Sequence, residues 1–411
     1  MSKWERVTAL FANGARPLVP TDELSFADLL RANRMPPSMF QAYEVPGDGS
    51  LRPVPITHTL DQIPEPSTVI LQCMRNTDVD ILPHTLHIQG HSADPVAAMY
   101  DLRYAEKDPE HRVHLLDDEQ LREIVFTKIA DFLREHRVAP PLVAGISGGG
   151  DSSSIVRGLD RYVTPEGFRR DQVLCFTVVL DPIWRGTAAD RARDLCHGYG
   201  FGHRVLHPED IASLLGMSAS PEALWREIRS TYGADSSHFF GTWLLNMVGR
   251  ALNREIGGTS LLMGYNREDV MAELLFCLMN GRRPLPYPKR RTGDVDCFMP
   301  VWDVPKVLLD SCYPQVSEVN YSERIDSTAP RRSSIYYQAH ALDAIVPQMS
   351  LSLMTGVRTL MDSLNGWQTL EEIDGTPLLH TGHGSPEERK ALVRLLARYF
   401  PGWSVSEADR Q

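Results

Sequence analysis

The sequence predicts an α/β protein in which a domain built on a parallel sheet follows a small α+β unit. Apolar strand patterns alternate with helical patterns from Leu142 to Gly281, which is typical of a parallel sheet with helices on both faces. The residues before this region show two strands, a helix and two more strands. A chain of 411 residues is also long enough for two domains.

Composition narrows the classes of protein to consider. The formal net charge of −11 argues against wide, nonspecific nucleic-acid binding. The six cysteines are scattered without a CxxC pair, which favours a reducing compartment such as the cytoplasm over a disulfide framework. We expect no signal peptide at residues 1–13 and no membrane span, because no apolar run approaches the roughly 20 residues that a bilayer requires.

The first unit is predicted at residues 1–80. A strand in "WERVTALFANG" ends at the turn pair Asn13-Gly14, "RPLVP" can form its hairpin partner, and Ser25 can cap a helix in "SFADLLRANRM". Strands in "QAYEVPGDGSLRPVP" and "STVILQCM" complete an order that resembles a ubiquitin-like β-grasp domain of the sulfur-carrier type. Such carriers end in a free Gly-Gly, whereas this strand runs on into "RNTDVDILPH". We therefore expect a docking or lid domain.

Residues 81–115, with the polar stretch "RYAEKDPEHR", are predicted to be a linker. The main domain is expected at residues 116–350 and a helical appendage at 351–411. The main domain opens with "LDDEQLREIVFTKIADFLREH", whose acidic start suits the N-terminal end of a helix dipole. Its apolar residues recur at helical spacing.

A glycine-rich turn joins the strand "PLVAGIS" to the helix "SSSIVRGLDRY". It consists of Ser147, Gly148, Gly149, Gly150, Asp151 and Ser152. Bare backbone N–H groups at a helix N-terminus form a site for an anion, and the serine hydroxyls can contact phosphate oxygens. A carboxylate beside phosphate is unfavourable unless a cation lies between them, so Asp151 implies Mg²⁺. No GK[ST] follows, which excludes a Walker A loop.

The run "SGGGDS" resembles the SGGxDS loop of the PP-loop, or N-type, ATP pyrophosphatases. The resemblance implies an adenine nucleotide α-hydrolase-like (HUP) fold with ATP and Mg²⁺ as cofactors. These enzymes split ATP between its α and β phosphates and transfer AMP to a carbonyl or carboxyl oxygen, and a nucleophile then displaces AMP. All six turn residues would bind the nucleotide, and Asp151 would be catalytic and hold the metal.

A second segment, "LLMGYNREDVMAELLFCLMNGRR", resembles the tRNA(Ile)-lysidine synthetase and tRNA 2-thiocytidine synthetase branch, which has G-H-x-x-D-D-x-x-E-T here. By this resemblance Asp269 is a catalytic metal ligand and Asn266 contacts the nucleotide. Tyr265 replaces the usual His. Ala272 stands where the branch has Glu, and Glu273 comes one place later, which turns its carboxylate by about 100° around a helix.

A third match lies further on. "RRPLPYPKRRTGDVDCFMPVWDVPK" resembles the basic loop of the branch. A mobile loop here could close on ATP phosphates or grip an acidic substrate, and a solvated loop is the alternative for its five basic residues, Arg282, Arg283, Lys289, Arg290 and Arg291. "VNYSERIDSTAPRRSSIYYQAHALDAIVP" resembles the end of the branch, where Asn320, Arg332 and Ile335 match and Tyr336 replaces a final Arg. Arg332 is the catalytic candidate here.

Several features depart from the branch or stand apart from it. The thiolating members carry paired cysteines where this chain has "GADSSHFF" and "NYSERID", so we expect no iron–sulfur cluster and no structural zinc.

Cys175 and Cys277 are predicted to be core thiols and Cys312 to be exposed. "HTGHG" at 380–384 is predicted to be a turn. Asp181 and Arg185 are candidates to flank the adenine.

These features predict an ATP-dependent, AMP-forming ligase whose nucleophile is an amine. The acceptor is an RNA base, a small molecule or a protein end, the last two in a specialised biosynthetic or defence pathway. A nucleotide-sensing scaffold without catalysis is the alternative function. The sequence leaves open whether two copies of the chain form a homodimer.

Overall fold

The computed structural model describes most of the chain. The described residues are 6–11, 14–16, 18–19, 25–33, 35–73, 86–91, 96–101, 111–181, 184, 186–233, 237–323, 330–345, 348–369, 372–373, 376–378 and 386–403. The chain divides into two compact units. The first comprises Met1–Val125, Val304–Glu318 and Gln338–Thr355, and the second comprises Phe126–Asp303, Val319–Tyr337 and Gly356–Gln411.

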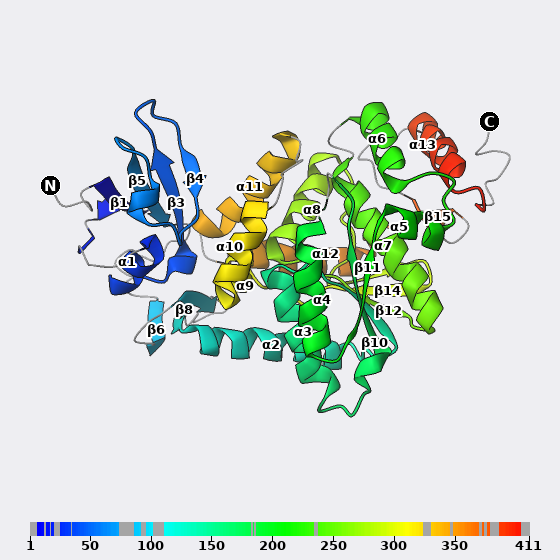
Figure 1. Ribbon diagram of the computed structural model, residues 1–411, viewed down its shortest axis with the longest axis horizontal. Helices are drawn as coiled ribbons and strands as arrows, with labels where there is room; N and C mark the ends of the chain where they lie inside the picture. The colour runs from blue at the N-terminus through cyan, green and yellow to red at the C-terminus, as the bar shows by residue number, and fades with distance from the viewer. Residues whose placement is uncertain are drawn as a thin grey trace. The chain divides into compact units, whose positions relative to one another are not determined.

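The first unit contains a five-stranded mixed sheet in the order β2-β1-β5-β3-β4. β1 and β5 run parallel in the middle, and the other neighbours are antiparallel (Figure 1). Ser25 caps α1 by accepting a hydrogen bond from Asp28 N, as its sequence predicts. The elements are β1 Val7–Phe11, β2 Gly14–Arg16, α1 Phe26–Ala32, β3 Phe40–Val45, β4 Arg52–Val54 and β5 Thr68–Cys73.

The core of this unit forms between α1 and the sheet. Phe26, Leu29 and Leu30 of α1 are fully buried and belong to one apolar cluster with Ala42 and Leu71 of the sheet. Burial of such side chains is worth about 1.5–3 kcal/mol each. The helical spacing of the apolar residues therefore defines the face of α1 that the sheet covers.

The predicted linker is not an extended connection throughout. Within 81–115 the described residues contribute strands, and these form a three-stranded sheet in the order β6-β8-β7. The polar run that suggested a linker lies largely at 102–110, outside the described residues. The strands are β6 Leu86–His91, β7 Ala97–Asp101 and β8 His111–Leu116.

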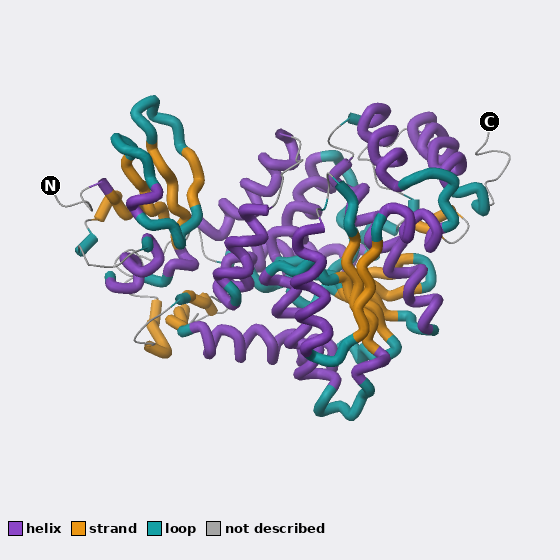
Figure 2. The backbone as a smooth tube through the Cα atoms, viewed as in Figure 1, coloured by secondary structure: helices purple, strands orange, loops and turns teal. Residues whose placement is uncertain are grey.

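The second unit contains the α/β fold that the alternating patterns predict. Its six-stranded sheet has the order β11-β10-β9-β12-β14-β13, and all strands are parallel except β13. Figure 1 shows α3 and α4 on one side of this sheet and α7 on the other, and Figure 2 shows the same layers by type of element. The strands are β9 Leu142–Gly145, β10 Val173–Val178, β11 Gly202–Leu206, β12 Ser260–Leu262, β13 Lys289–Thr292 and β14 Val295–Phe298.

The strand order reverses between β9 and β12. The chain proceeds from β9 to β10 and β11 in one direction and then returns to place β12 on the other side of β9. In open parallel sheets such a switch point opens a crevice at the carboxyl ends of the strands, where ligands bind. The helices of this part are α3 Gly150–Val163, α4 Ala189–Gly198, α5 Pro208–Leu215, α6 Pro221–Tyr232, α7 Ser237–Ile256 and α8 Arg267–Met279.

Four helices include residues of both units, and the remaining elements are short or close to the C-terminus. The shared helices are α2 Asp118–Glu135, α10 Pro314–Glu323, α11 Pro330–Ile345 and α12 Met349–Leu364. The others are α9 Lys306–Cys312, β15 Glu372–Ile373, β16 Thr376–Pro377 and α13 Pro386–Tyr399. Among the described helices, none has the length and apolar character that spanning a bilayer requires.

The cysteines are all buried, which corrects one expectation. Cys312 is fully buried at the end of α9 although its neighbouring prolines suggested exposure. Cys175 and Cys277 are core thiols as predicted, and burial raises the pKa of Cys277 to about 12. A thiol with so high a pKa is a poor nucleophile at neutral pH.

Candidate functional site

The glycine-rich turn lies at the carboxyl end of β9, where the sheet reverses its strand order. β9 ends at Gly145 and α3 begins at Gly150, so the turn is a short strand-to-helix connection. The second candidate segment follows β12, which pairs with β9 in the register Ala144↔Leu262. Because the two parallel strands end at the same level, the residues that follow them meet at one edge of the sheet.

Gly148 has no room for a side chain, and the space at Gly149 is tight. Gly148 has φ +77°, and a Cβ there would lie 2.5 Å from the carbonyl oxygen of Ala188. A Cβ on Gly149 would lie 3.2 Å from Nδ2 of Asn320, so this carboxamide packs against the turn. The turn is thus bordered by α10 and by the residues before α4. Its three glycines are buried, and Ser147 at its beginning is exposed.

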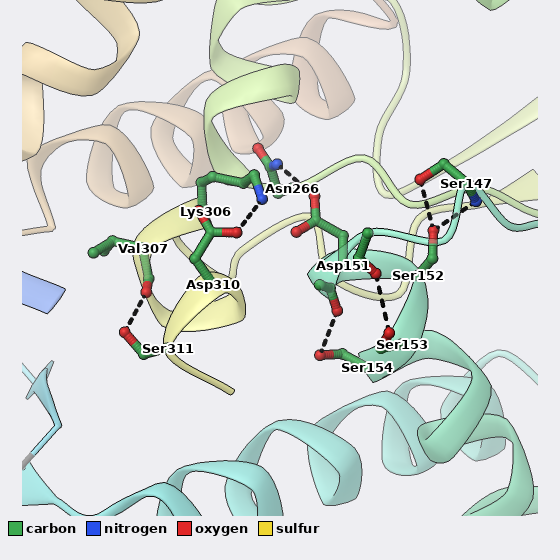
Figure 3. Close-up of polar contacts among 12 residues, drawn as sticks. Ser147, Asp151, Ser152, Ser153, Ser154, Asn266, Lys306, Val307, Asp310 and Ser311 are labelled. Atoms are coloured by element: carbon green, nitrogen blue, oxygen red, sulfur yellow. Dashed lines mark hydrogen bonds and ion pairs between the residues drawn. The ribbon is translucent and has the colours of Figure 1, made fainter. Parts of the chain in front are cut away.

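The serines of the turn form a small hydrogen-bonded set (Figure 3). Ser147 N donates to Ser152 Oγ over 2.8 Å, and the Ser147 and Ser152 hydroxyls lie 2.9 Å apart. Ser153 and Ser154 instead donate to carbonyl oxygens one helical turn earlier. The exposed Ser147 hydroxyl is therefore the one placed to meet a ligand, with Ser152 fixing its position.

Asp151, Asn266 and Asp269 are brought together by the two strand ends. Asn266 Nδ2 donates to Asp151 Oδ2 over 3.2 Å (Figure 3). Asn266 Oδ1 accepts from Asp269 N over 3.0 Å. Asp269 Oδ2 in turn accepts from Asn266 N over 3.1 Å, which completes a capping box at the start of α8. Three residues predicted from separate motifs thus share one site.

The electrostatics of this group favour a cation. Burial, followed by the nearby charge of Asp151, raises the pKa of Asp269 to about 6. A divalent ion bound between the two carboxylates would offset the cost of ionising Asp269 beside Asp151. Mg²⁺ commonly takes one or two protein carboxylates together with substrate phosphates and water. The donor set of Asp151 and Asp269 fits this mode, and in the described part of the chain no three His, Cys, Asp or Glu residues group as metal ligands.

Tyr336 is a site residue that the motif comparison marked only as a departure. Its hydroxyl donates to Asp269 Oδ1 over 3.1 Å from α11. The residues around Tyr336, which lies four places after Arg332, contain no sequence pattern that predicts this contact. Only the position of α11 relative to α8 within the second unit reveals it.

Three of the five basic residues predicted to lie in a mobile loop, Lys289, Arg290 and Arg291, lie in strand β13, and one of them pairs with Glu273. Arg290 is buried in β13 and forms a bidentate salt bridge with Glu273, with N···O distances of 2.7 and 3.2 Å. Lys289 and Arg291 pair with Asp296 on the adjacent strand. The prediction that these bases form a loop that closes on phosphates is wrong for the residues in β13.

Tyr265, which replaces the histidine of the resembled branch, belongs to this buried group. The Arg290 guanidinium lies 5.8 Å from the centre of the Tyr265 ring, and burial raises the pKa of Tyr265 well above its usual value. The hydroxyl also makes a hydrogen bond with the Thr242 side chain. Its contacts with Arg290 and Thr242 place it in the buried group around Glu273.

Other predicted residues cannot be placed at the site. The backbone of Arg332 is in α11, but its side chain lies outside the described residues, as do Arg185 and the 380–384 segment. Asp181 is exposed after β10, and Trp184 makes a backbone bridge with Leu180. The roles predicted for Arg332, Asp181 and Arg185 stay predictions.

Comparison with solved structures gives weak likenesses, among them a tRNA thiolase and an NAD+ synthetase. No family model matches the sequence, and no curated protein does. The U34-tRNA thiolase NcsA from Methanococcus maripaludis, with its [4Fe-4S] cluster, has 18% identity and a TM-score of 0.45, covering 59% of this chain and 80% of that chain. NAD+ synthetase from Burkholderia pseudomallei has 14% identity and a TM-score of 0.33, covering 60% of this chain and 91% of that chain. With scores this low, the fold class rests on the strand order and register.

The expectation that no iron–sulfur cluster belongs here is corrected by the first likeness. NcsA is described with a [4Fe-4S] cluster.

Proposed function

We propose that the second unit binds ATP with its β and γ phosphates at Ser147–Ser152 and forms AMP and pyrophosphate. The observation that carries the proposal is the bridge from Asp151 through Asn266 to Asp269, directly beside a turn that has no room for a side chain at Gly148. A phosphate site and a pair of carboxylates at the switch point of a parallel sheet suit a nucleotide with its metal.

The chemistry follows from this placement. An acceptor oxygen attacks the α-phosphorus, a new P–O bond forms, and the bond to the bridging oxygen breaks so that pyrophosphate leaves. An amine then attacks the adenylated carbon and releases AMP. Asp151 and Asp269 would hold Mg²⁺, which when bound supplies positive charge to the departing phosphates. The residues of the turn supply positioning and hydrogen bonds.

The acceptor is proposed to be a carbonyl or carboxyl oxygen, as in lysidine formation on RNA. A small molecule or a protein end is a second candidate, since the net charge of −11 gives no general attraction for nucleic acid. For the first unit we propose a docking role. Its strand order, with parallel β1 and β5 in the middle, supports the β-grasp likeness.

Nucleotide sensing without turnover is a second candidate function, and the position of Tyr265 favours it. This residue stands at the place of the branch's histidine but contacts Arg290 and Thr242. A site that keeps its phosphate turn and loses a reacting group can still bind ATP.

The test uses ATP labelled separately at the α and γ phosphates, with Mg²⁺ and cell extract fractionated into RNA, protein and small molecules. We expect labelled AMP and pyrophosphate with one fraction, and mass spectrometry then identifies the AMP-linked species. ADP as the product contradicts the proposal. Tight ATP binding with no product in any fraction supports the sensor. Gly148→Ala serves as the control that removes the phosphate turn.

A further inference from the structure

The Asp269 carboxylate is held at both of its oxygens. Oδ2 accepts from the main-chain N–H of Asn266 over 3.1 Å, and Oδ1 accepts from the Tyr336 hydroxyl over 3.1 Å. The first contact belongs to the capping box and forms within one turn of α8. The second comes from α11, which is distant in sequence, so it is not needed for α8 to begin.

Tyr336 is well placed to act on Asp269 through this hydrogen bond. It is partly buried, and Ile335 beside it is almost fully buried, so α11 is anchored at this point. The next residue, Tyr337, is 69% exposed and lies on a different side of the helix. Two adjacent tyrosines therefore differ in their surroundings, and one of them reaches the carboxylate pair.

The chemistry of the donor matters for a cation site. A phenol hydroxyl fixes the direction of a carboxylate but adds no charge, so the negative charge of Asp151 and Asp269 stays available to a divalent cation. A guanidinium or ammonium at the same place would pair with Asp269 and oppose the binding of a cation. A neutral donor is thus the type of group that orients a metal ligand without competing with the metal.

We infer that Tyr336 is a positioning residue for divalent cation binding, which it serves by holding Asp269 Oδ1 so that the carboxylate stays directed beside Asp151. This inference rests on the proposed function, because it takes Asp151 and Asp269 as the residues that hold the cation of the nucleotide. It assigns a role in the site to α11 in addition to α3 and α8.

The test measures Mn²⁺ binding by electron paramagnetic resonance, with the full chain and the non-cleavable analogue α,β-methylene-ATP. Tyr336→Phe removes only the hydroxyl, and we expect the dissociation constant for Mn²⁺ to rise about three- to tenfold, the loss of one hydrogen bond. Tyr337→Phe is the matched control and should bind Mn²⁺ like the wild type. Circular dichroism during heating checks that each variant is folded.

The outcomes separate this inference from the proposed function. If the wild type binds Mn²⁺ with the analogue and Tyr336→Phe binds it equally well, the inference is overturned and the proposed function stands. If the wild type binds neither Mn²⁺ nor the analogue, the inference and the proposed function are both overturned. If Tyr336→Phe does not fold, Tyr336→Gln, which keeps a neutral donor, is compared with Tyr336→Leu, which does not. A smaller loss for the Gln variant supports the inference, and equal losses overturn it.

Discussion

The side-chain amide of Asn266 joins the beginning of α8 to Asp151 in the first turn of α3, with an N···O distance of 3.2 Å. The other end of the same carboxamide caps α8 by accepting from Asp269 N. Asn266 therefore uses its donor and its acceptor at once, and no other side chain of this size except an amide can do so. The contact connects two helices that follow neighbouring parallel strands.

The two functions of Asn266 can be separated by substitution. Asn266→Ala removes the cap and the bridge, and should lower the free energy of unfolding by about 1 kcal/mol. Asn266→Ser keeps a good capping oxygen but cannot donate to Asp151, so its stability should stay close to that of the wild type. We expect both variants to lose ATP affinity by about ten- to a hundredfold, because a hydrogen bond to a charged group is worth roughly 1.5–3 kcal/mol. Calorimetry gives both quantities, and wild-type affinity in the Ser variant would contradict the bridge's role.

Gly148 should tolerate no side chain. A Cβ there would lie 2.5 Å from a main-chain oxygen, and φ is +77°. Gly167 has φ +72° but nothing within 4 Å of an added Cβ, so it is the matched control. Gly167→Ala should cost about 1–2 kcal/mol of stability from the backbone alone. Gly148→Ala should cost clearly more and abolish ATP binding, and equal unfolding midpoints in urea would show that the steric contact is unimportant.

The stability of the protein should depend on pH through Asp269. Its folded-state pKa of about 6 lies above the ordinary value of 3.8, so the folded state holds a proton that the unfolded state has released between these values. The stabilising contribution of this group is thus complete below 3.8 and is lost as pH rises through about 6, by up to roughly 3 kcal/mol. Urea unfolding with EDTA across this window should show the decline in the wild type and not in Asp269→Asn. The same slope in both proteins would assign it to other groups.

The buried pair of Glu273 and Arg290 should act as one structural element. Glu273→Gln leaves a buried guanidinium without its counter-charge, at a cost of about 3–5 kcal/mol. Replacing both residues with apolar ones, Glu273→Leu with Arg290→Met, should recover most of this loss. Arg291 on the same strand pairs with Asp296 at the surface, and Arg291→Met should cost about 1 kcal/mol or less. If Glu273→Gln costs no more than Arg291→Met, the pair is not significant for folding.

Local sequence patterns were sufficient for the α/β class and for the position of the turn. The alternation of apolar strands with helices reports backbone periodicity, and the three glycines report a need for bare main chain. Both signals are contained in short windows, which is why the strand before Ser147 and the helix after it are found where the pattern places them. The Ser25 cap is local in the same way.

The tertiary structure decided which of these residues meet. Asp151 and Asn266 are 115 residues apart, and they touch because β9 and β12 are neighbours that end in register. Arg290, which the sequence suggested for a phosphate-binding loop, is instead neutralised by Glu273, and Tyr336 reaches Asp269 from α11. Propensity and periodicity describe how each segment folds. The pairing of side chains depends on which strands lie side by side, and this is determined by the packing of the whole unit.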